Sequence, residues 1–147
     1  MNYEMSHLEM LSHAFDFYGM RETPGEDDNP QIVQFFHALG FDWVQDDETG
    51  WCSAFINYLA KVNGYEYSGK LNARSWLDTG VEMKLPTVGD IVVLWRESPE
   101  SWKGHVGMFA RHDGVNIWVL GGNQGNAVNI SPYPMGRLLG YRRLRKR

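Results

Sequence analysis

A single cysteine lies where the chain could place a nucleophile. Cys52 occurs in the stretch "DDETGWCSAFINYLAK", after an acidic loop and at the start of a run with the period of an amphipathic helix. A helix N-terminus supplies partial positive charge and free backbone N–H groups, which favour a thiolate and can stabilise an oxyanion. Position alone leaves two alternatives open for Cys52, a nucleophile or a small buried residue.

A histidine further along the chain could serve as the base. His105 begins the β-prone run in "KGHVGMF", and the flanking Gly104 and Gly107 leave room for another chain to approach, as a substrate cleft requires. Its imidazole could take the proton of Cys52 and later return it to a leaving amine. A histidine at a strand end is, taken alone, more often a structural residue with a satisfied hydrogen bond.

The stretch "VLGGNQGNAV" offers a partner for the second ring nitrogen of that histidine. A catalytic imidazole needs such a partner to fix its tautomer and orientation. Either Asn123 or Gln124 could supply a side-chain carbonyl. The same composition is also typical of an ordinary Gly/Asn turn.

Strand register decides between these two neighbours. A two-residue turn at Asp113-Gly114 makes the numbers of paired residues sum to about 227, which puts Gln124 on the face of His105. A three-residue loop makes the sum about 226 and favours Asn123, as does a bulge at Gly121-Gly122.

Four helices are expected in the first half of the chain. Apolar residues recur there at three- and four-residue steps, Ser6 is expected to cap the first helix, and Asn29 precedes a proline at a first helical position. The expected helices cover residues 6–18, Pro30 to about Gly40, Cys52 to Val62 with Gly64 as the stop, and "LNARSWLDTG" as far as Gly80.

After residue 85 the pattern changes to short β-prone runs separated by Gly, Pro, Asn or Asp. The runs "GDIVVLWR", "HVGMFAR", "VNIWVLGG", "AVNISPY" and "LLGYRRL" predict an antiparallel meander of about five strands. Helices followed by strands indicate an α+β fold, with the N-terminal helices packed on the C-terminal sheet. We predict one domain over residues 1–147, with a helical part at about 1–84, the meander at about 85–144 and a basic tail at 142–147.

Composition excludes several classes of protein. One cysteine permits neither an internal disulfide nor a cysteine-based zinc site, and no histidine falls in an HExxH pattern. The start of the chain lacks the pattern of a signal peptide and no stretch resembles a transmembrane segment, so we expect synthesis in the cytoplasm and no membrane insertion. The five basic residues of 142–147 raise the alternative of nucleic-acid binding, which the acidic remainder of the chain opposes.

Taken together, the motifs "WCSAF", "GDIVVLWR", "GHVGMF" and "GGNQGNAV" resemble NlpC- and CHAP-like papain-fold peptidoglycan hydrolases. The similarity extends over residues 20–143 and includes the small phage-lysin and bacterial-effector branch. It implies a papain-like fold and a cysteine amidase or peptidase that acts on cell-wall peptide stems, either an N-acetylmuramoyl-L-alanine amidase or a stem endopeptidase.

The resemblance also implies roles for individual residues. By it, Cys52 is the nucleophile, His105 is the base and Asn123 orients the imidazole, with Gln124 as the alternative. Further residues that could line the site are Trp51, Glu48 and Gly104. The competing hypothesis is a wall-binding module of the same fold that performs no chemistry.

Expectations about metals and partners follow from the same resemblance. Some CHAP enzymes bind calcium through acids before and after the cysteine, but Ser53 and Ala54 supply no carboxylate here, so we predict no required metal or cofactor. Asp46, Asp47 and Glu48 precede the cysteine in an acidic loop. The expected partner is peptidoglycan, reached through a holin or a secretion system, with an immunity protein if the chain is an antibacterial effector.

Overall fold

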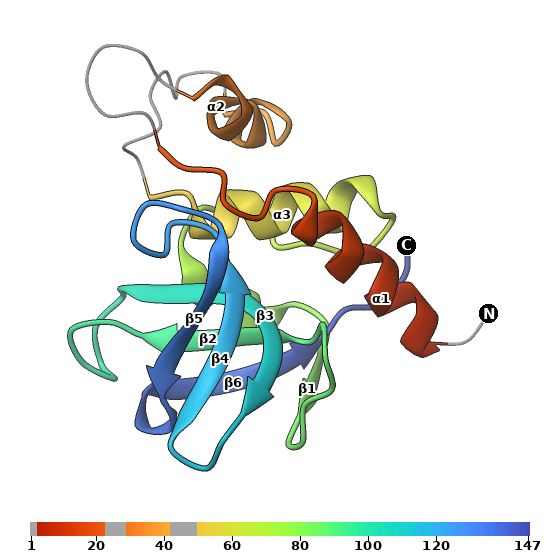
Figure 1. Cartoon of the computed structure of the whole chain (residues 1–147). Helices are drawn as coiled ribbons and strands as arrows, with labels where there is room; N and C mark the ends of the chain where they lie inside the picture. The colour runs from red at the N-terminus through yellow and green to blue at the C-terminus, as the bar shows by residue number, and fades with distance from the viewer. Residues whose placement is uncertain (1–2, 23–28, 42–49) are drawn as a thin grey trace.

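The computed structural model describes residues 3–22, 29–41 and 50–147, and it has an α+β fold in which helices cover one antiparallel sheet (Figure 1). The helices are α1 (Tyr3–Phe15), α2 (Pro30–His37) and α3 (Cys52–Val62), with 3-10 turns η1 (Ala73–Asp78) and η2 (Met135–Arg137). The strands are β1 (Val81–Met83), β2 (Ile91–Trp95), β3 (Gly104–His112), β4 (Asn116–Gly121), β5 (Asn129–Pro134) and β6 (Leu138–Arg143). The fold class predicted from the sequence is confirmed.

The sheet is larger than the predicted meander. Its six strands run in the order β1-β6-β2-β3-β4-β5, so only β2 to β5 form a meander, and β6 returns to pair with β2. The strand that was not predicted is β1, at the edge of the sheet, which pairs with β6 through Val81↔Arg143 and Met83↔Tyr141. Three residues are too few to show a period, which explains why β1 was missed.

Strand β2 is buried on both faces. Ile91 and Val93 pack into the main core beneath the helices, whereas Val92 and Leu94 join a second apolar cluster with Phe109. This explains why β2 reads as an unbroken apolar run instead of an alternating one. A strand with both faces covered needs neighbours on both edges, and β3 and β6 provide them.

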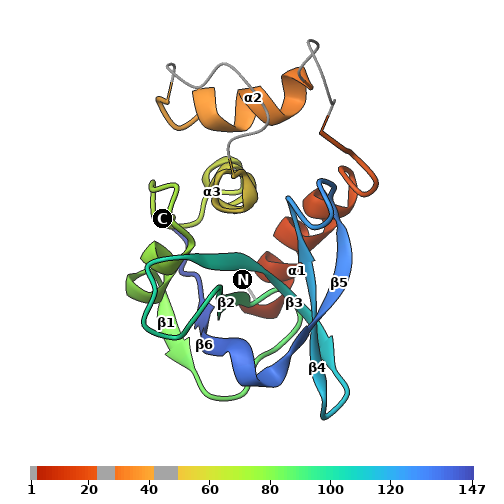
Figure 2. The same cartoon turned by 90° about the vertical axis from the view of Figure 1, so that its left-hand side faces the viewer.

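Helix α3 occupies the middle of the molecule, between α2 on one side and the sheet on the other (Figure 2). Aromatic ring contacts fill the space around it: Phe17 meets Phe55 edge-on with 5.9 Å between ring centroids, and Phe35 is tilted against Phe55 at 5.4 Å. Because α3 is buried almost all round, its first turn is held rigidly against β3.

The helix starts show which capping signals were informative. The side chain of Asn29 accepts a hydrogen bond of 2.9 Å from the backbone N–H of Gln31, and Pro30 takes the first helical position, as predicted. Helix α1 begins at Tyr3, so Ser6 lies inside the helix and the prediction that it is the N-cap was wrong. In the described residues, no helix combines the length and apolar character needed to cross a membrane.

The basic segment 142–147 packs on the body of the domain. The Arg143 guanidinium contacts both carboxylate oxygens of buried Asp90, at 2.9 and 2.8 Å. Arg145 pairs with Glu66 at 2.7 Å, and the backbone N–H of Arg147 donates to the carbonyl of Gly64. The sequence interpretation favoured a solvated end, whereas these contacts make the segment part of the fold.

Deleting Arg145 to Arg147 is therefore expected to destabilise the domain by about 1–3 kcal/mol, because it removes the Glu66 pair and a backbone bridge. Urea unfolding followed by circular dichroism measures the change. Arg111→Gln, which alters an exposed arginine elsewhere on the sheet, serves as the charge control. An unchanged unfolding midpoint in the deletion variant would restore the interpretation of a solvated tail.

Candidate active site

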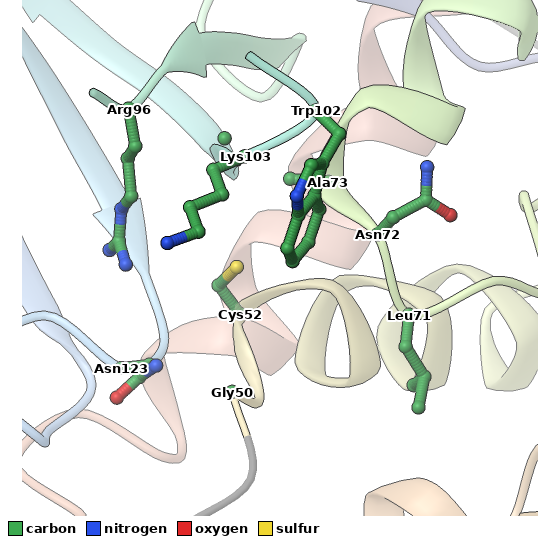
Figure 3. Close-up of a pocket in the computed structure, with 10 residues that line it drawn as sticks. Gly50, Cys52, Leu71, Asn72, Ala73, Arg96, Trp102, Lys103 and Asn123 are labelled. Atoms are coloured by element: carbon green, nitrogen blue, oxygen red, sulfur yellow. The ribbon is translucent and has the colours of Figure 1, made fainter. Parts of the chain in front are cut away.

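An open cavity of about 350 Å³ lies at the N-terminus of α3. In Figure 3 the sulfur of Cys52 points into it, with Arg96 and Lys103 on one side and Trp102 on the other. The remaining lining residues come from the segment before α3, from the start of η1 and from the ends of β3 and β4: Gly50, Leu71, Asn72, Ala73, Gly104 and Asn123. The cavity thus joins residues that are distant in sequence around one thiol.

The position of Cys52 is fixed by the residue before it. Trp51 is fully buried, and its indole N–H donates to Glu22 at 2.5 Å. Its ring lies so close to Gly122 that a Cβ there would come within 2.5 Å of a ring carbon. Trp51 therefore packs the start of α3 against the loop after β4. It was expected to be able to line the site, but it is not among the residues that line this cavity.

The far wall of the cavity is held by a polar cluster inside α3. Buried Asn57 accepts a hydrogen bond from the backbone N–H of Gly69 at 2.8 Å and donates to the carbonyl of Lys70 at 3.1 Å. Ser53 donates to the same carbonyl at 2.7 Å and accepts from the indole N–H of Trp76 at 3.0 Å. This cluster fixes the path of the chain into Leu71 and Asn72, which line the cavity.

The charge state of Cys52 differs from the sequence-based expectation. Burial raises the pKa of the thiol above its ordinary value, although the backbone N–H of Val106, the Arg96 guanidinium and the first N–H groups of α3 act in the opposite direction. The helix N-terminus helps the thiolate, as expected, but desolvation outweighs it. The resting side chain is therefore a protonated thiol at neutral pH.

His105 is held in one tautomer by Gln124. The ring Nε2 lies 2.9 Å from the side-chain oxygen of Gln124. The Gln124 amide nitrogen donates to the backbone carbonyls of Val119 and Asn129, at 3.1 and 2.8 Å, which fixes the orientation of the amide. Since the amide oxygen faces the ring, Nε2 carries the proton and Nδ1 carries the lone pair.

The partner of His105 is thus Gln124, and the assignment of Asn123 is corrected. Strand β4 ends at Gly121, and Asn123 adopts a φ of 57°, which turns the chain back on itself. Side chains alternate between the two faces of a sheet only within a strand. The strand register therefore could not predict the direction of the side chain of residue 123. The side chain of Asn123 lies at the cavity wall instead.

The turn before β4 was also placed incorrectly. The register is His112↔Ile117 near the turn and Phe109↔Val119 beyond it, with an irregularity between Phe109 and Arg111. The Asp113 carboxylate accepts from the N–H groups of Val115 and Asn116, at 3.0 and 2.7 Å, which shifts the turn one residue later. Neither expected register therefore occurs.

Two glycines let the backbone come close to the site. A Cβ on Gly121 would lie 2.7 Å from the side-chain oxygen of Gln124, and a Cβ on Gly104 would lie 2.8 Å from the carbonyl of Leu94. Any larger residue at these positions would displace the partner of His105 or open the β2–β3 pair. Gly104 was predicted as a lining residue, and it lines the cavity.

Arg96 is a site residue that the sequence analysis did not single out. One of its guanidinium nitrogens lies 3.2 Å from His105 Nδ1. Leu94 pairs directly with His105, so Arg96, two residues after Leu94 and just past the end of β2, is a diagonal neighbour of the histidine. The signal was the first polar residue after the apolar run of β2, but it needed the hairpin register to be interpreted.

The environment of His105 keeps the imidazole neutral. Its pKa is lowered from 6.5 to about 4, chiefly by burial and in smaller part by the charge of Arg96, while the hydrogen bond to Gln124 acts in the opposite direction. The ring stacks on Tyr133, with 5.1 Å between ring centroids, and burial raises the pKa of that phenol to about 12. The His105 imidazole is therefore uncharged in the resting protein at neutral pH, as the Cys52 thiol is.

The loop between β2 and β3 is braced from outside the cavity. The Arg74 guanidinium donates to three backbone carbonyls of this loop, those of Ser98, Pro99 and Lys103, at 2.7–2.9 Å. Lys103 also pairs with Glu97 at 2.8 Å. Trp102, which is 73% exposed, projects from the loop beside the cavity.

Some predicted residues cannot be placed. Asp46, Asp47 and Glu48 lie outside the described residues, so the expectation that Glu48 lines the site stays a prediction. The expectation of no required metal also stays a prediction. Next to the cysteine, the hydroxyl of Ser53 is already engaged with Lys70 and Trp76.

Comparisons with known proteins agree with this fold. The P60 domain of an antigen from M. avium subspecies paratuberculosis superposes with a TM-score of 0.58 at 13% identity, covering 98% of this chain and 96% of that one. A protein similar to lipoproteins of the NLP/P60 family, from Staphylococcus aureus subsp. aureus Mu50, gives 0.57 at 13% identity and 97% coverage of this chain. The chain spans 42% of the length of that protein. No curated protein matches the sequence significantly.

The fold is that of the NlpC/P60 domains, and the cysteine lies at the start of a buried helix. The CHAP domain family matches residues 44–123, more than half of the chain, so the protein belongs to the CHAP domain family. Membership makes it a peptidoglycan-related domain of the cysteine hydrolase type.

The buried neutral His105 predicts a pH-dependent stability. Because its pKa in the folded state, about 4, is below the 6.5 of the unfolded chain, the unfolded state binds more protons between these values. The contribution is complete above about pH 6.5, is lost as the pH falls toward 4, and amounts to at most about 3 kcal/mol. Urea unfolding at pH 7.5, 6 and 5 should show a steeper loss for the wild type than for His105→Gln; parallel curves would contradict a neutral buried ring.

Proposed function

We propose that the protein hydrolyses an amide bond in the peptide stems of peptidoglycan, with Cys52 as nucleophile and His105 as base. The observation that carries the proposal is the tautomer of His105, whose Nε2 proton is held by Gln124 so that Nδ1 can accept a proton. The open cavity at Cys52 and the membership in the CHAP family support peptidoglycan as the substrate.

Catalysis begins with transfer of the thiol proton from Cys52 to His105 Nδ1. The thiolate attacks the carbonyl carbon of the scissile amide, and the C–N bond then breaks as Nδ1 returns the proton to the leaving amine. The acyl group remains on sulfur as a thioester. Water, deprotonated by the same nitrogen, hydrolyses the thioester and restores the thiol.

Backbone groups at the start of α3 would stabilise the developing oxyanion. Cys52 is the first residue of the helix, where backbone N–H groups have no partner inside the helix. Such donors act on negative charge as it develops in the transition state. The N–H of Val106 lies on the thiol side and opposes the effect of desolvation on the sulfur.

Gln124 takes the orienting role that the sequence analysis gave to Asn123. A neutral amide fixes the ring through one hydrogen bond, yet it provides no negative charge for an imidazolium. The base therefore stays weak, which agrees with a mechanism in which the proton moves only as the thiol reacts. Asn123, at the cavity wall, is placed to contact substrate instead.

The bond that is cut is either the amide between muramic acid and L-alanine or a peptide bond of the stem. An N-acetylmuramoyl-L-alanine amidase releases whole stems from the glycan, whereas an endopeptidase leaves part of each stem attached. Mass spectrometry of muropeptides after digestion of purified walls separates these products. A phage endolysin delivered after holin action and an antibacterial effector neutralised by an immunity protein are both consistent with either product.

A wall-binding module without activity is the competing function. The exposed Trp102 beside the cavity would suit binding of a wall fragment in either case. Loss of turbidity of a wall suspension, combined with a sedimentation assay for binding, distinguishes the two functions. Binding by the wild type without any turbidity loss or new muropeptides would favour the module.

Cys52→Ser is expected to preserve the fold and to reduce wall hydrolysis by at least about 10³-fold, because a serine hydroxyl is not ionised by this site. His105→Ala should lower activity comparably, and the double variant should add little, since the pair acts as a unit. His112→Ala, at the far end of β3, is the control and should stay within about tenfold of wild type. Retained hydrolysis by Cys52→Ser would exclude the thiol mechanism.

Gln124→Ala is expected to lower kcat by about 10- to 100-fold with little change in KM, because the ring loses its orientation but the cleft keeps its shape. Asn123→Ala should lower kcat less and act mainly on KM. Steady-state kinetics on a soluble muropeptide measures both. If Asn123→Ala proved the more damaging to kcat, the original assignment of the orienting residue would be reinstated.

A further inference from the structure

Positive charge gathers at the cavity although the whole chain has a net charge of −4. Arg96 and Lys103 both line the cavity (Figure 3). Lys103 is neutralised by Glu97, with 2.8 Å between Nζ and the carboxylate oxygen. Within the described residues, the partner of the Arg96 guanidinium is the neutral ring of His105. Arg96 thus presents an uncompensated positive charge to the cavity.

We propose that Arg96 binds a carboxylate of the substrate and that this contact withdraws its guanidinium from His105 Nδ1. The identity of that substrate as a peptide stem rests on the proposed function. Arg96 would then be both a specificity residue, which selects stems with free carboxylates, and a positioning residue, which controls when the base is available.

The contact between Arg96 and His105 is the first reason. In its neutral form, Nδ1 has one lone pair in the ring plane, and at 3.2 Å the guanidinium donates to it. A nitrogen that already accepts this hydrogen bond cannot take the proton of Cys52. Some event must therefore move Arg96 away before Nδ1 can act as the base.

The chemistry of guanidinium groups supplies the second reason. A carboxylate accepts two parallel N–H bonds from arginine, and such charge-assisted pairs are about twice as strong as bonds between neutral groups. A neutral imidazole nitrogen offers one acceptor without charge. A substrate carboxylate within reach should therefore displace the ring as the partner of Arg96.

When a carboxylate draws the Arg96 guanidinium away from His105, the guanidinium stays near the reacting atoms. The charge of Arg96 favours the ionised form of Cys52 in the resting site, and a short swing toward the cavity leaves it beside the sulfur. The proton that leaves Cys52 moves to Nδ1, and the guanidinium stays protonated throughout. The bound carboxylate partly neutralises the Arg96 guanidinium. The guanidinium then destabilises a protonated His105 imidazole less than it does in the resting site.

The first experiment tests the carboxylate site without requiring hydrolysis. The rate constants for alkylation of Cys52 by iodoacetate and by iodoacetamide are measured. Each is divided by the rate constant of the same reagent with 2-mercaptoethanol, which corrects for the intrinsic reactivity of the reagent. In the wild type the normalised ratio of iodoacetate to iodoacetamide should be about tenfold higher than in Arg96→Met, which keeps much of the side-chain length without charge or donors. Arg96→Lys should lie between them.

Arg111→Met is the matched control for net charge. Arg111 stacks on Trp118 at the other end of β3, 4.4 Å from the ring centroid, and has no role in the cavity. Its alkylation ratio should equal that of the wild type. If the alkylation ratio is the same in the wild type and in Arg96→Met, the carboxylate site is overturned. It is also overturned if the ratio falls equally in Arg96→Met and Arg111→Met.

The second experiment tests the coupling to the base. Two soluble muropeptides are compared, one with free stem carboxylates and one with the same carboxylates amidated. The wild type should prefer the free form by at least about tenfold in kcat/KM, and Arg96→Met should show no preference. On the amidated substrate, Arg96→Met should have a kcat about fivefold above that of the wild type, the value of one net hydrogen bond, because Nδ1 is no longer occupied.

The outcomes separate this inference from the proposed function. Hydrolysis of both muropeptides without a preference retains the hydrolase but overturns the role of Arg96. An alkylation ratio that depends on Arg96, in a protein that cleaves neither muropeptide, supports the carboxylate site and overturns the hydrolase. A kcat of Arg96→Met on the amidated substrate that falls below the wild-type value rules out the coupling.

Discussion

Burial of α3 is the constraint on which the rest of the structure depends. The helix is enclosed by α1, α2 and the sheet, and eight of its residues are buried. Because water cannot reach them, Ser53 and Asn57 must find partners within the protein, and they find them in the segment that forms the cavity wall. The packing that stabilises the domain thus also positions the thiol and the surface opposite it.

The same burial determines the electrostatics of the site. Desolvation raises the pKa of the Cys52 thiol and lowers that of the His105 imidazole, so each group is neutral at pH 7. A preformed thiolate–imidazolium pair would require charge in a site that disfavours it. Both groups are accordingly uncharged in the resting protein.

The sequence was informative wherever a local signal determined the structure. The proline and asparagine at the start of α2, the helical period from Cys52 and the apolar runs of the five longer strands all act within one element. Other features depend on how elements meet. Gln124 was named only as the alternative partner of His105, because the sequence does not show that the Asp113 side chain shifts a turn and that Asn123 takes a positive φ.

Arg96 and the segment 142–147 were missed or misjudged for a related reason. A basic residue after a strand and a basic run both look like solvated surface when only composition is available. Their roles follow from register, which sets Arg96 beside His105, and from the buried Asp90, which requires the Arg143 guanidinium. Burial of a charge is a property of the assembled fold and leaves little trace in the sequence near it.

Because Arg74 braces the β2–β3 loop, the residues of this loop can change without changing the rest of the fold. Arg74 holds the loop through backbone carbonyls, which every residue possesses, so the side chains of the loop are free to vary while its path is kept. The exposed side chains of this loop reach the cavity without contributing to either apolar core. A few substitutions in this one loop could thus change the surface that borders the cavity and leave Cys52, His105 and the sheet unaltered.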